Sequence, residues 1–224
     1  MTGTVRIDMV SDIACPWCAI GITTLESAIH ALQGSLHVEV HLQPFELNPG
    51  MGPGGEDVIA HLSGKYGISH EQVLENQQRI YQRGREVGFE FHPEGRKRVY
   101  NTFNCHRLIH WAQVECGLEQ AFALKKALFA AYFTHAADMD QSETLLNAVE
   151  NAGLDKDRAA QILASDEFAS NVREAENHWR QIGIQSVPAF ILNGRYLVSG
   201  AQPQENLVAA IRQAHQMAAQ QQDK

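Results

Sequence analysis

Residues 5–32 have the sequence VRIDMVSDIACPWCAIGITTLESAIHAL, which contains the pattern Cys15-Pro16-Trp17-Cys18. The short apolar run 5–10 predicts a strand, and the apolar spacing of 19–32 predicts a helix. Two thiols at this spacing, at a strand-to-helix junction, are typical of thiol–disulfide chemistry. The first lies near the helix N-terminus, where unpaired backbone N–H groups and the helix dipole favour a thiolate. The two cysteines share one face of the helix, so their sulfurs can close a small ring.

Length, composition and charge limit the possible functions. The 224 residues suffice for one large domain or two modest ones, and 44% hydrophobic with 20% charged residues is ordinary for a soluble globular protein. The net charge of −8 argues against a nucleic acid or an anionic membrane as partner, because phosphate binding needs a cationic surface. The first ten residues, MTGTVRIDMV, do not resemble a signal peptide, and no apolar run approaches the roughly 18 residues of a membrane span. We therefore expect a cytoplasmic protein, as a monomer or homodimer.

Cysteine usage leaves two alternatives to redox chemistry. Zinc could use Cys15 and Cys18 as half of a tetrahedral site, but a second Cys or His pair at matching spacing is missing, so we expect no metal. Cys105 and Cys116 are eleven positions apart on one predicted helix, which separates them by about 16 Å along its axis. They therefore cannot easily form a disulfide with each other. We expect both to be small buried apolar side chains.

The two ends of the chain predict strands. Residues 37–42 alternate with period two, so 1–45 form a βαβ unit with a right-handed crossover and a parallel strand pair. A Pro/Gly-rich loop or domain boundary follows at 44–55. Near the other end, Asn193-Gly194 is a hairpin turn signal between strands at 187–192 and 195–199. An amphipathic helix from 203 to about 217 closes the chain.

The middle of the chain, 56–183, predicts helices almost throughout. Ser69 with Gln72 and Asp140 with Glu143 resemble capping boxes, and Ser165 is a predicted helix start. The order of elements predicts an α/β protein, a thioredoxin-like fold with a large all-helical insertion between its two halves. We assign 1–45 and 184–224 to the thioredoxin-like domain and 56–164 to the insertion. The last inserted helix, at about 165–183, is a candidate to pack with the first domain.

Several further segments carry a family resemblance. Together with 11–18, these are 44–49 (PFELNP), Asn101-Thr102 with His106, 131–133 (AYF), 186–190 (SVPAF) and 198–202 (VSGAQ). On these residues the chain resembles DsbA-type thioredoxin-fold oxidoreductases, and more narrowly the FrnE-like cytoplasmic branch. The resemblance implies that Cys15 is the nucleophile, that Cys18 resolves the mixed disulfide, and that the Val187-Pro188 bond is cis and faces the disulfide.

Two positions depart from common family features. Thioredoxin relatives often have a buried carboxylate six residues before the first cysteine, where this chain has Met9. Proton transfer from the buried thiol then needs another group, such as Asp12 or water. Strongly oxidising DsbA proteins carry Pro-His between the cysteines, and Trp17 cannot supply an imidazolium. We therefore expect a less oxidising couple.

Other residues are weaker candidates for the site. Pro16 restrains the first helical turn, and Trp17 is expected to cover the apolar rim of the site. Asp12 could relay a proton or cap the loop before the helix. Residues 95–98 (GRKR) could bind an anion, although a solvated loop is the preferred interpretation. The candidate substrate cleft comprises Phe45, Asn48, His106, Gly200, Ala201 and Gln202.

The sequence leads to three hypotheses about function. The first is a thiol–disulfide oxidoreductase or isomerase that acts on a protein or small-molecule disulfide or thiol, with no bound cofactor and with glutathione as a candidate thiol co-substrate. The second is a glutathione-dependent isomerase or transferase, similar to hydroxychromene-carboxylate isomerase and the kappa-class transferases. These relatives typically have Ser where this chain has Cys15. The third is a peptide-binding chaperone with secondary redox activity.

Overall fold

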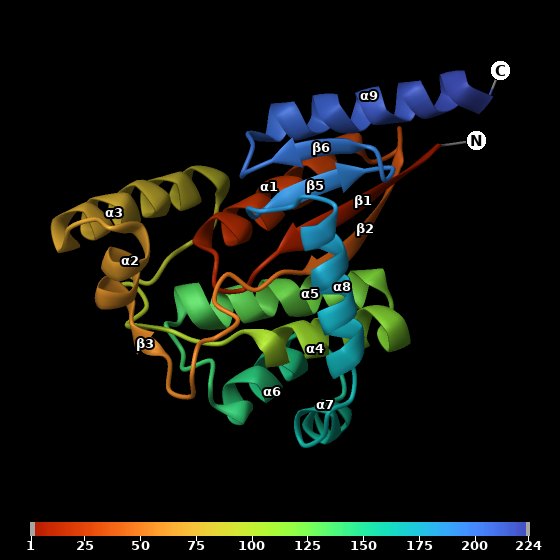
Figure 1. Ribbon diagram of the computed structural model, residues 1–224. Helices are drawn as coiled ribbons and strands as arrows, with labels where there is room; N and C mark the ends of the chain where they lie inside the picture. The colour runs from red at the N-terminus through yellow and green to blue at the C-terminus, as the bar shows by residue number, and fades with distance from the viewer. Residues whose placement is uncertain (1–2, 223–224) are drawn as a thin grey trace.

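The computed structural model describes residues 3–222, whose strands and helices are shown in Figure 1. The strands are β1 (Thr4–Ser11), β2 (His37–Pro44), β3 (Glu56–Asp57), β4 (Arg98–Val99), β5 (Ala189–Leu192) and β6 (Tyr196–Ser199). The helices are α1 (Pro16–Leu32), α2 (Val58–Tyr66), α3 (His70–Val87), α4 (Phe103–Trp111), α5 (Leu118–Phe129), α6 (Ser142–Asn151), α7 (Lys156–Leu163), α8 (Ala169–Gln181) and α9 (Gln204–Gln222). Turns of π-helix at Ala112–Cys116 and Ala130–Thr134 extend α4 and α5.

The main sheet has the strand order β2-β1-β5-β6. β1 pairs with β2 in parallel and with β5 antiparallel, so that Met9 lies opposite both Leu42 and Phe190. The central strand is buried from Ile7 to Ser11 because both of its edges are paired and both of its faces are covered. The predicted parallel βαβ unit, C-terminal hairpin and thioredoxin-like fold with inserted helices are confirmed.

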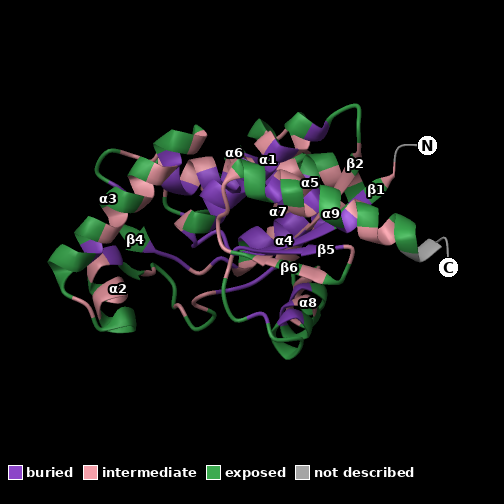
Figure 2. Ribbon diagram, turned by 90° about the horizontal axis from the view of Figure 1, so that it is seen from above, coloured by how far each residue is buried: buried purple, intermediate pink, exposed green. Residues whose placement is uncertain are grey.

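Helices cover both faces of this sheet. Seen from above, α1 and α8 lie on opposite sides of β5 and β6 (Figure 2). α9 packs against α1, while α4, α5 and α8 pack against β2. The α2–α3 pair stands at the end of the molecule where α1 begins, and α3 contacts α1 (Figure 1). The inserted helices therefore reach the end of the sheet that holds the two cysteines.

Local sequence signals explain several element ends. The Ser69 hydroxyl accepts a hydrogen bond from the backbone of Gln72, whose side chain accepts one from the backbone of Ser69, so the predicted capping box is confirmed. Asn193 and Gly194 both have positive φ, 51° and 67°, as the predicted tight hairpin turn requires.

Other local predictions are wrong. Asp140 does not cap α6; its carboxylate instead accepts a hydrogen bond from the backbone of Gly54, and Gln141 is the N-cap. α8 begins at Ala169 rather than at Ser165, after Phe168 with φ of 62°. The short strands β3 and β4 form a two-stranded sheet within the segment that we predicted to be helical.

The hydrophobic core is continuous between the sheet and the inserted helices. Its largest cluster joins Ile22 of α1 and Phe190 of β5 to Leu128 of α5 and Trp111 of α4. The elements that surround the cysteines are therefore held by shared packing. Among residues 3–222, no helix combines the length and apolar character needed to cross a bilayer.

Candidate active site

Cys15 and Cys18 lie at the start of α1. Cys15 is the N-cap residue and has an extended backbone, and Pro16 occupies the first turn, where no hydrogen-bond donor is needed. The backbone N–H of Cys18 donates to the carbonyl of Cys15 at 3.0 Å. The Cys15 residue is 5% exposed and Cys18 is fully buried. Both are free thiols, so this is the dithiol form of the pair.

The two thiols differ in acidity. The hydrogen bond from Cys18, helped by backbone N–H groups and opposed by burial, lowers the pKa of Cys15. Burial raises the pKa of Cys18 well above its usual value, and its interactions with Cys15 raise it further. The geometry therefore favours a thiolate on Cys15 and keeps the proton on Cys18, which suits one thiol to attack and the other to resolve.

The Val187-Pro188 bond is cis, as the resemblance implied. The carbonyl oxygen of Val187 lies 3.6 Å from the Cys15 sulfur. Pro188 packs against Gly21 of α1, where an added Cβ would lie 3.1 Å from the proline ring. Glycine at this position lets α1 and the Val187–Pro188 loop approach closely enough to place the carbonyl beside the thiol.

Gly200, Ala201 and Gln202 form the turn after β6. The Gly200 N–H donates to the Pro188 carbonyl at 2.8 Å, and the Gln202 amide donates to the Ser199 carbonyl at 2.7 Å. This turn thus supports the proline loop, and its three residues do not line the pocket beside Cys15. Their role as cleft residues stays a prediction, and the contact that the structure shows is with the backbone of Pro188.

Asp12 is a buried anion between β1 and α1. Its carboxylate accepts hydrogen bonds from the backbone of Ala14 (3.0 Å) and Leu47 (2.7 Å) and from the Thr102 hydroxyl (2.7 Å). Burial alone would raise the pKa of Asp12, but His106 and these N–H groups outweigh it and lower that pKa. Asp12 therefore joins three separate segments of chain at the site. Met9 is fully buried and apolar.

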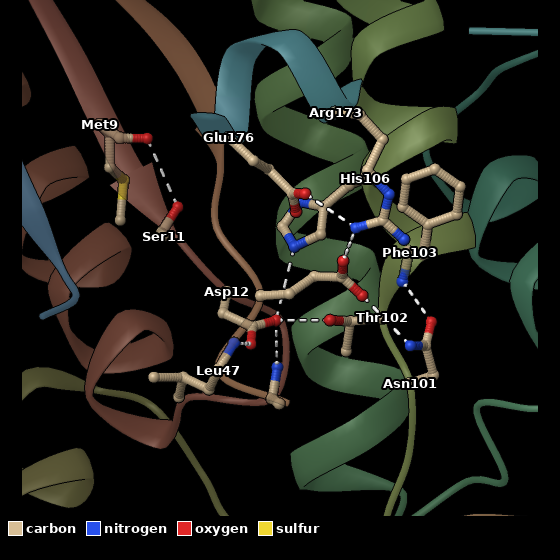
Figure 3. Close-up of polar contacts among 12 residues, drawn as sticks. Met9, Ser11, Asp12, Leu47, Asn101, Thr102, Phe103, His106, Arg173 and Glu176 are labelled. Carbon is tan, nitrogen blue, oxygen red and sulfur yellow. Dashed lines mark hydrogen bonds and ion pairs between the residues drawn. The ribbon is translucent and has the colours of Figure 1, made fainter. Parts of the chain in front are cut away.

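His106 lies behind Asp12, with its Nε2 atom 3.4 Å from the Asp12 carboxylate (Figure 3). This contact is an ion-pair separation without hydrogen-bond geometry, since Nε2 has no hydrogen-bond partner among the described residues. His106 is 2% exposed. Its prediction as a cleft residue is wrong: α4 directs this side chain into the protein, where it acts on Asp12 rather than on a substrate.

Two buried carboxylates and a partly exposed arginine form a network beyond His106. Arg173 contacts the carboxylates of both Glu46 and Glu176, and its guanidinium lies 3.7 Å from the centre of the Phe103 ring (Figure 3). Glu46 also accepts a hydrogen bond from the Asn101 amide at 3.2 Å. Arg173 and Glu176 could not be predicted from the sequence, because no local motif marks either residue.

A pocket of about 510 Å³ opens beside Cys15, between the start of α1 and the α2–α3 pair. Trp17, 39% exposed, forms part of its wall, as predicted, and so does Asn48. Phe45 does not line it and packs instead with Val10 and Trp179. The Phe45 prediction is therefore wrong. A hollow of about 700 Å³ elsewhere is larger, but neither cysteine lines it.

Cationic side chains line the pocket beside Cys15. Lys65, Arg79 and Arg96 contribute to its wall together with His61, and no Asp or Glu is among its described lining residues. Arg96 is 8% exposed, donates to the Ala14 carbonyl at 2.8 Å, and lies over the Tyr132 and Phe133 rings. The preferred interpretation of 95–98 as a solvated loop is therefore wrong for Arg96, which holds the loop that carries the cysteines.

The family of this protein follows from its match to known sequences. A family model described as a DSBA-like thioredoxin domain matches residues 6–212. The chain belongs to this family. The probable DsbA oxidoreductase SCO1869 from Streptomyces coelicolor is 33% identical, over 94% of this chain and 89% of that one, with a TM-score of 0.84. The DsbA-like fold therefore extends over nearly the whole chain.

Two more distant structures share the fold alone. The cytosolic disulfide reductase DsbM from Pseudomonas aeruginosa, solved with GSH, is 16% identical, over 98% of this chain and 100% of that one, with a TM-score of 0.60. A 2-hydroxychromene-2-carboxylate isomerase is 15% identical, over 97% of this chain and 98% of that one, with a TM-score of 0.70. The DsbA-like fold is thus found in proteins with different activities.

This DsbA-like site contains no cluster suited to a metal among the described residues, where no group of three or more His, Cys, Asp or Glu gathers. Cys105 is buried and Cys116 is half-buried; both are free thiols.

Proposed function

We propose that the protein exchanges disulfides through Cys15 and Cys18. The Cys15 thiolate attacks a substrate disulfide R–S–S–R′, forms Cys15–S–S–R and releases R′–S⁻. Cys18 then attacks Cys15 in this mixed disulfide, which closes the Cys15–Cys18 disulfide. The substrate thiolate R–S⁻ leaves with the electron pair of the broken disulfide bond and takes up the proton that Cys18 lost. A reducing thiol restores the dithiol, and the reverse sequence oxidises a substrate.

The difference between the two thiols is the observation that carries this proposal. Cys15 has the lowered pKa and lies at the surface of a pocket, whereas Cys18 is buried with a raised pKa. An attacking thiol needs thiolate character and access, and a resolving thiol needs only to reach the first sulfur. The Val187 carbonyl beside Cys15 could in addition receive the backbone N–H of an extended substrate.

The pocket charges favour an anionic substrate. Three cationic residues and no described Asp or Glu line the space beside Cys15, although the protein carries a net charge of −8. A small acidic disulfide or thiol is attracted there, whereas an acidic protein surface is repelled by the rest of the molecule. Glutathione, which accompanies DsbM in its structure, fits this class and is our proposed co-substrate. We place the protein in the cytoplasm, where glutathione is abundant.

Trapping the intermediate tests this function. In Cys18→Ala, Cys15 can still attack glutathione disulfide but cannot be released, so we expect a stable adduct of one glutathione on Cys15 by mass spectrometry. Cys15→Ala should form no adduct and should not reduce insulin disulfides. Cys116→Ala, which removes the half-buried thiol away from the pocket, is the matched control and should behave as wild type.

The other two hypotheses give different results in the same assays. A glutathione-dependent isomerase would be inactive towards disulfides and would turn over a glutathione-activated substrate in the absence of Cys15. A chaperone would lose disulfide reduction in Cys15→Ala but keep suppression of aggregation. Either result would count against disulfide exchange as the main function.

A further inference from the structure

Lys125 is a buried lysine on α5, and this helix contacts α1, the helix that begins at the two cysteines. It lies on α5 and is 1% exposed, and no described residue forms a hydrogen bond or ion pair with its ammonium. Its ammonium nitrogen lies over the face of the Phe129 ring, 5.9 Å from the ring centre. An unpaired charge in a protein interior is costly. Packing alone does not explain a lysine here, since methionine would fill similar space.

The charges that act on Lys125 belong to the active site. Cys18 acts most strongly, followed by Asp12, Cys105 and Cys15, and each would raise the pKa of the amine when negatively charged. Burial outweighs them and lowers the pKa of Lys125 to about 8. The amine is therefore protonated near neutral pH and is held within the electric field of the thiols.

Cys18 requires such a charge in order to resolve the mixed disulfide. Its thiol must ionise in a site where burial strongly opposes the thiolate. Asp12 cannot help by its charge, because one anion disfavours another. Cys105 is also buried, with a pKa raised far above its usual value, so it stays a neutral thiol. Met9 supplies no charge. The backbone of Asp12 favours the Cys18 thiolate through a hydrogen bond, and the charge of Lys125 favours it next.

We propose that Lys125 is the buried counter-charge that stabilises the Cys18 thiolate while it attacks the mixed disulfide. This proposal rests on the proposed function. The Cys18 sulfur bonds to the Cys15 sulfur as the bond between Cys15 and R breaks, and R–S⁻ takes the electron pair and the proton that Cys18 lost. Below its pKa Lys125 stays an ammonium and acts through its charge, so it is a positioning residue rather than a catalytic one.

The expected pH profile is specific to a titrating counter-charge. Below the pKa of Lys125, resolution speeds up about ten-fold per pH unit as Cys18 ionises. Above it, the amine has lost its charge in the resting state. The thiolate–ammonium pair then forms when the Cys18 proton moves to the neutral amine. No proton is lost to solvent, so the rate of resolution no longer rises with pH. The plot of the logarithm of the resolution rate against pH therefore bends at the pKa of Lys125. This bend should lie at or below about pH 8, because Cys15 carries no charge in the mixed disulfide and so no longer raises that pKa.

The test uses an aromatic disulfide, dithiobis-nitrobenzoate, which releases one coloured thiolate when Cys15 attacks and a second when Cys18 resolves. We expect Lys125→Met to slow the second release about ten-fold or more near pH 7 and to remove the bend, because a nearby opposite charge shifts a pKa by about one unit or more. The first release should change less. Lys125→Arg, which keeps the charge at every pH, should restore the rate and also lack the bend.

Two controls separate this effect from a structural one. Lys126→Met changes the next residue, a half-exposed lysine paired with Glu26, and should leave both releases unchanged. Lys125→Met should unfold at a higher temperature than wild type, since an apolar side chain replaces an unpaired buried charge. Lys125→Gln is a second neutral variant, with the same expected kinetics, in case methionine disturbs the packing.

Three outcomes would overturn the proposal: a second release in Lys125→Met that equals wild type at every pH, a slower release that keeps the bend, or a folded Lys125→Arg as slow as Lys125→Met. A wild-type protein that releases only one thiolate would instead refute the proposed disulfide exchange. The two failures are therefore distinguishable.

Discussion

Cys15 owes its acidity chiefly to Cys18, because the hydrogen bond from the buried thiol is the largest influence that lowers the pKa of Cys15. The helix N-terminus, which the sequence analysis emphasised, contributes through individual backbone N–H groups and has to work against burial. In the proposed exchange Cys18 would therefore have two roles, because it would resolve the mixed disulfide and also lower the pKa of Cys15.

Removing Cys18 should make Cys15 less reactive at neutral pH. The thiolate is the nucleophile, so the alkylation rate of Cys15 rises with pH through its pKa. In wild type the pH at which the alkylation rate is half of its maximum should lie below the pKa of a free cysteine. In Cys18→Ala this midpoint should move to higher pH. Iodoacetamide labelling across pH, read by mass spectrometry, measures both midpoints.

Cys105→Ala is the control for this shift, because Cys105 is not among the groups that act on Cys15. It should leave the Cys15 midpoint in place. Equal midpoints in wild type and Cys18→Ala would show that the helix terminus, rather than the neighbouring thiol, sets the acidity.

The wall of the pocket depends on how α3 ends. Gly84 is buried near the end of this helix, and an added Cβ would lie 2.7 Å from the Phe89 carbonyl oxygen and 2.5 Å from the Phe91 ring. Phe91 is itself stacked on Tyr81 and in edge contact with Phe133. The chain thus turns back tightly against α3, and glycine leaves the space for that contact.

Gly84→Ala should therefore destabilise the protein by about 1–3 kcal/mol, because neither the backbone oxygen nor the packed ring can move freely. Gly64→Ala is the matched control: Gly64 lies in α2, and no atom lies within 4 Å of an added Cβ. There alanine should stabilise by about 0.5–1 kcal/mol through helix propensity. Urea unfolding measures both changes, and a loss in Gly64→Ala as large as that in Gly84→Ala would contradict the steric explanation.

The two halves of the molecule are joined by charge as well as by apolar packing. Glu46, just after β2, and Glu176 on α8 share Arg173, and His106 on α4 lies between Asp12 and this group (Figure 3). Burial, with the charge of Glu46, raises the pKa of Glu176 against the opposing effects of His106 and Arg173. The fold therefore disfavours ionisation of Glu176 relative to the unfolded chain.

Glu176→Gln should stabilise the protein at neutral pH. A raised pKa in the folded state means that wild-type stability falls as pH rises from the unfolded value of about 4.3 through the folded value. Glutamine has no charge to lose, and its amide oxygen can still accept from Arg173. The variant should therefore be more stable than wild type at pH 7, with the difference closing near pH 4.

Urea unfolding at the two pH values measures this difference. Glu174→Gln, a solvent-exposed neighbour on the same helix, should change stability little at either pH. An advantage of Glu176→Gln that stays equal at pH 4 and pH 7 would show that ionisation of this acid is not its cause.

Much of the fold could be predicted from short stretches of sequence. The strand–helix–strand start, the capping box at Ser69 and the Asn193-Gly194 hairpin are local rules, and each is confirmed. Asp140 does not cap α6, because its carboxylate accepts a hydrogen bond from the backbone of Gly54, which is 86 positions away in the sequence. The errors at Phe45 and His106 have the same origin, since the direction of a side chain depends on which neighbours its element meets.

The sequence by itself determined that two thiols lie together at the start of a helix, because the spacing of Cys15 and Cys18 is a property of one continuous segment. The tertiary structure alone decided the electrostatic surroundings of that pair. Asp12, Arg96 and Lys125 come from separate segments, and their influence depends on burial and distance. Charge interactions act through space in a medium of low polarity, so no order of residues along the chain reveals them.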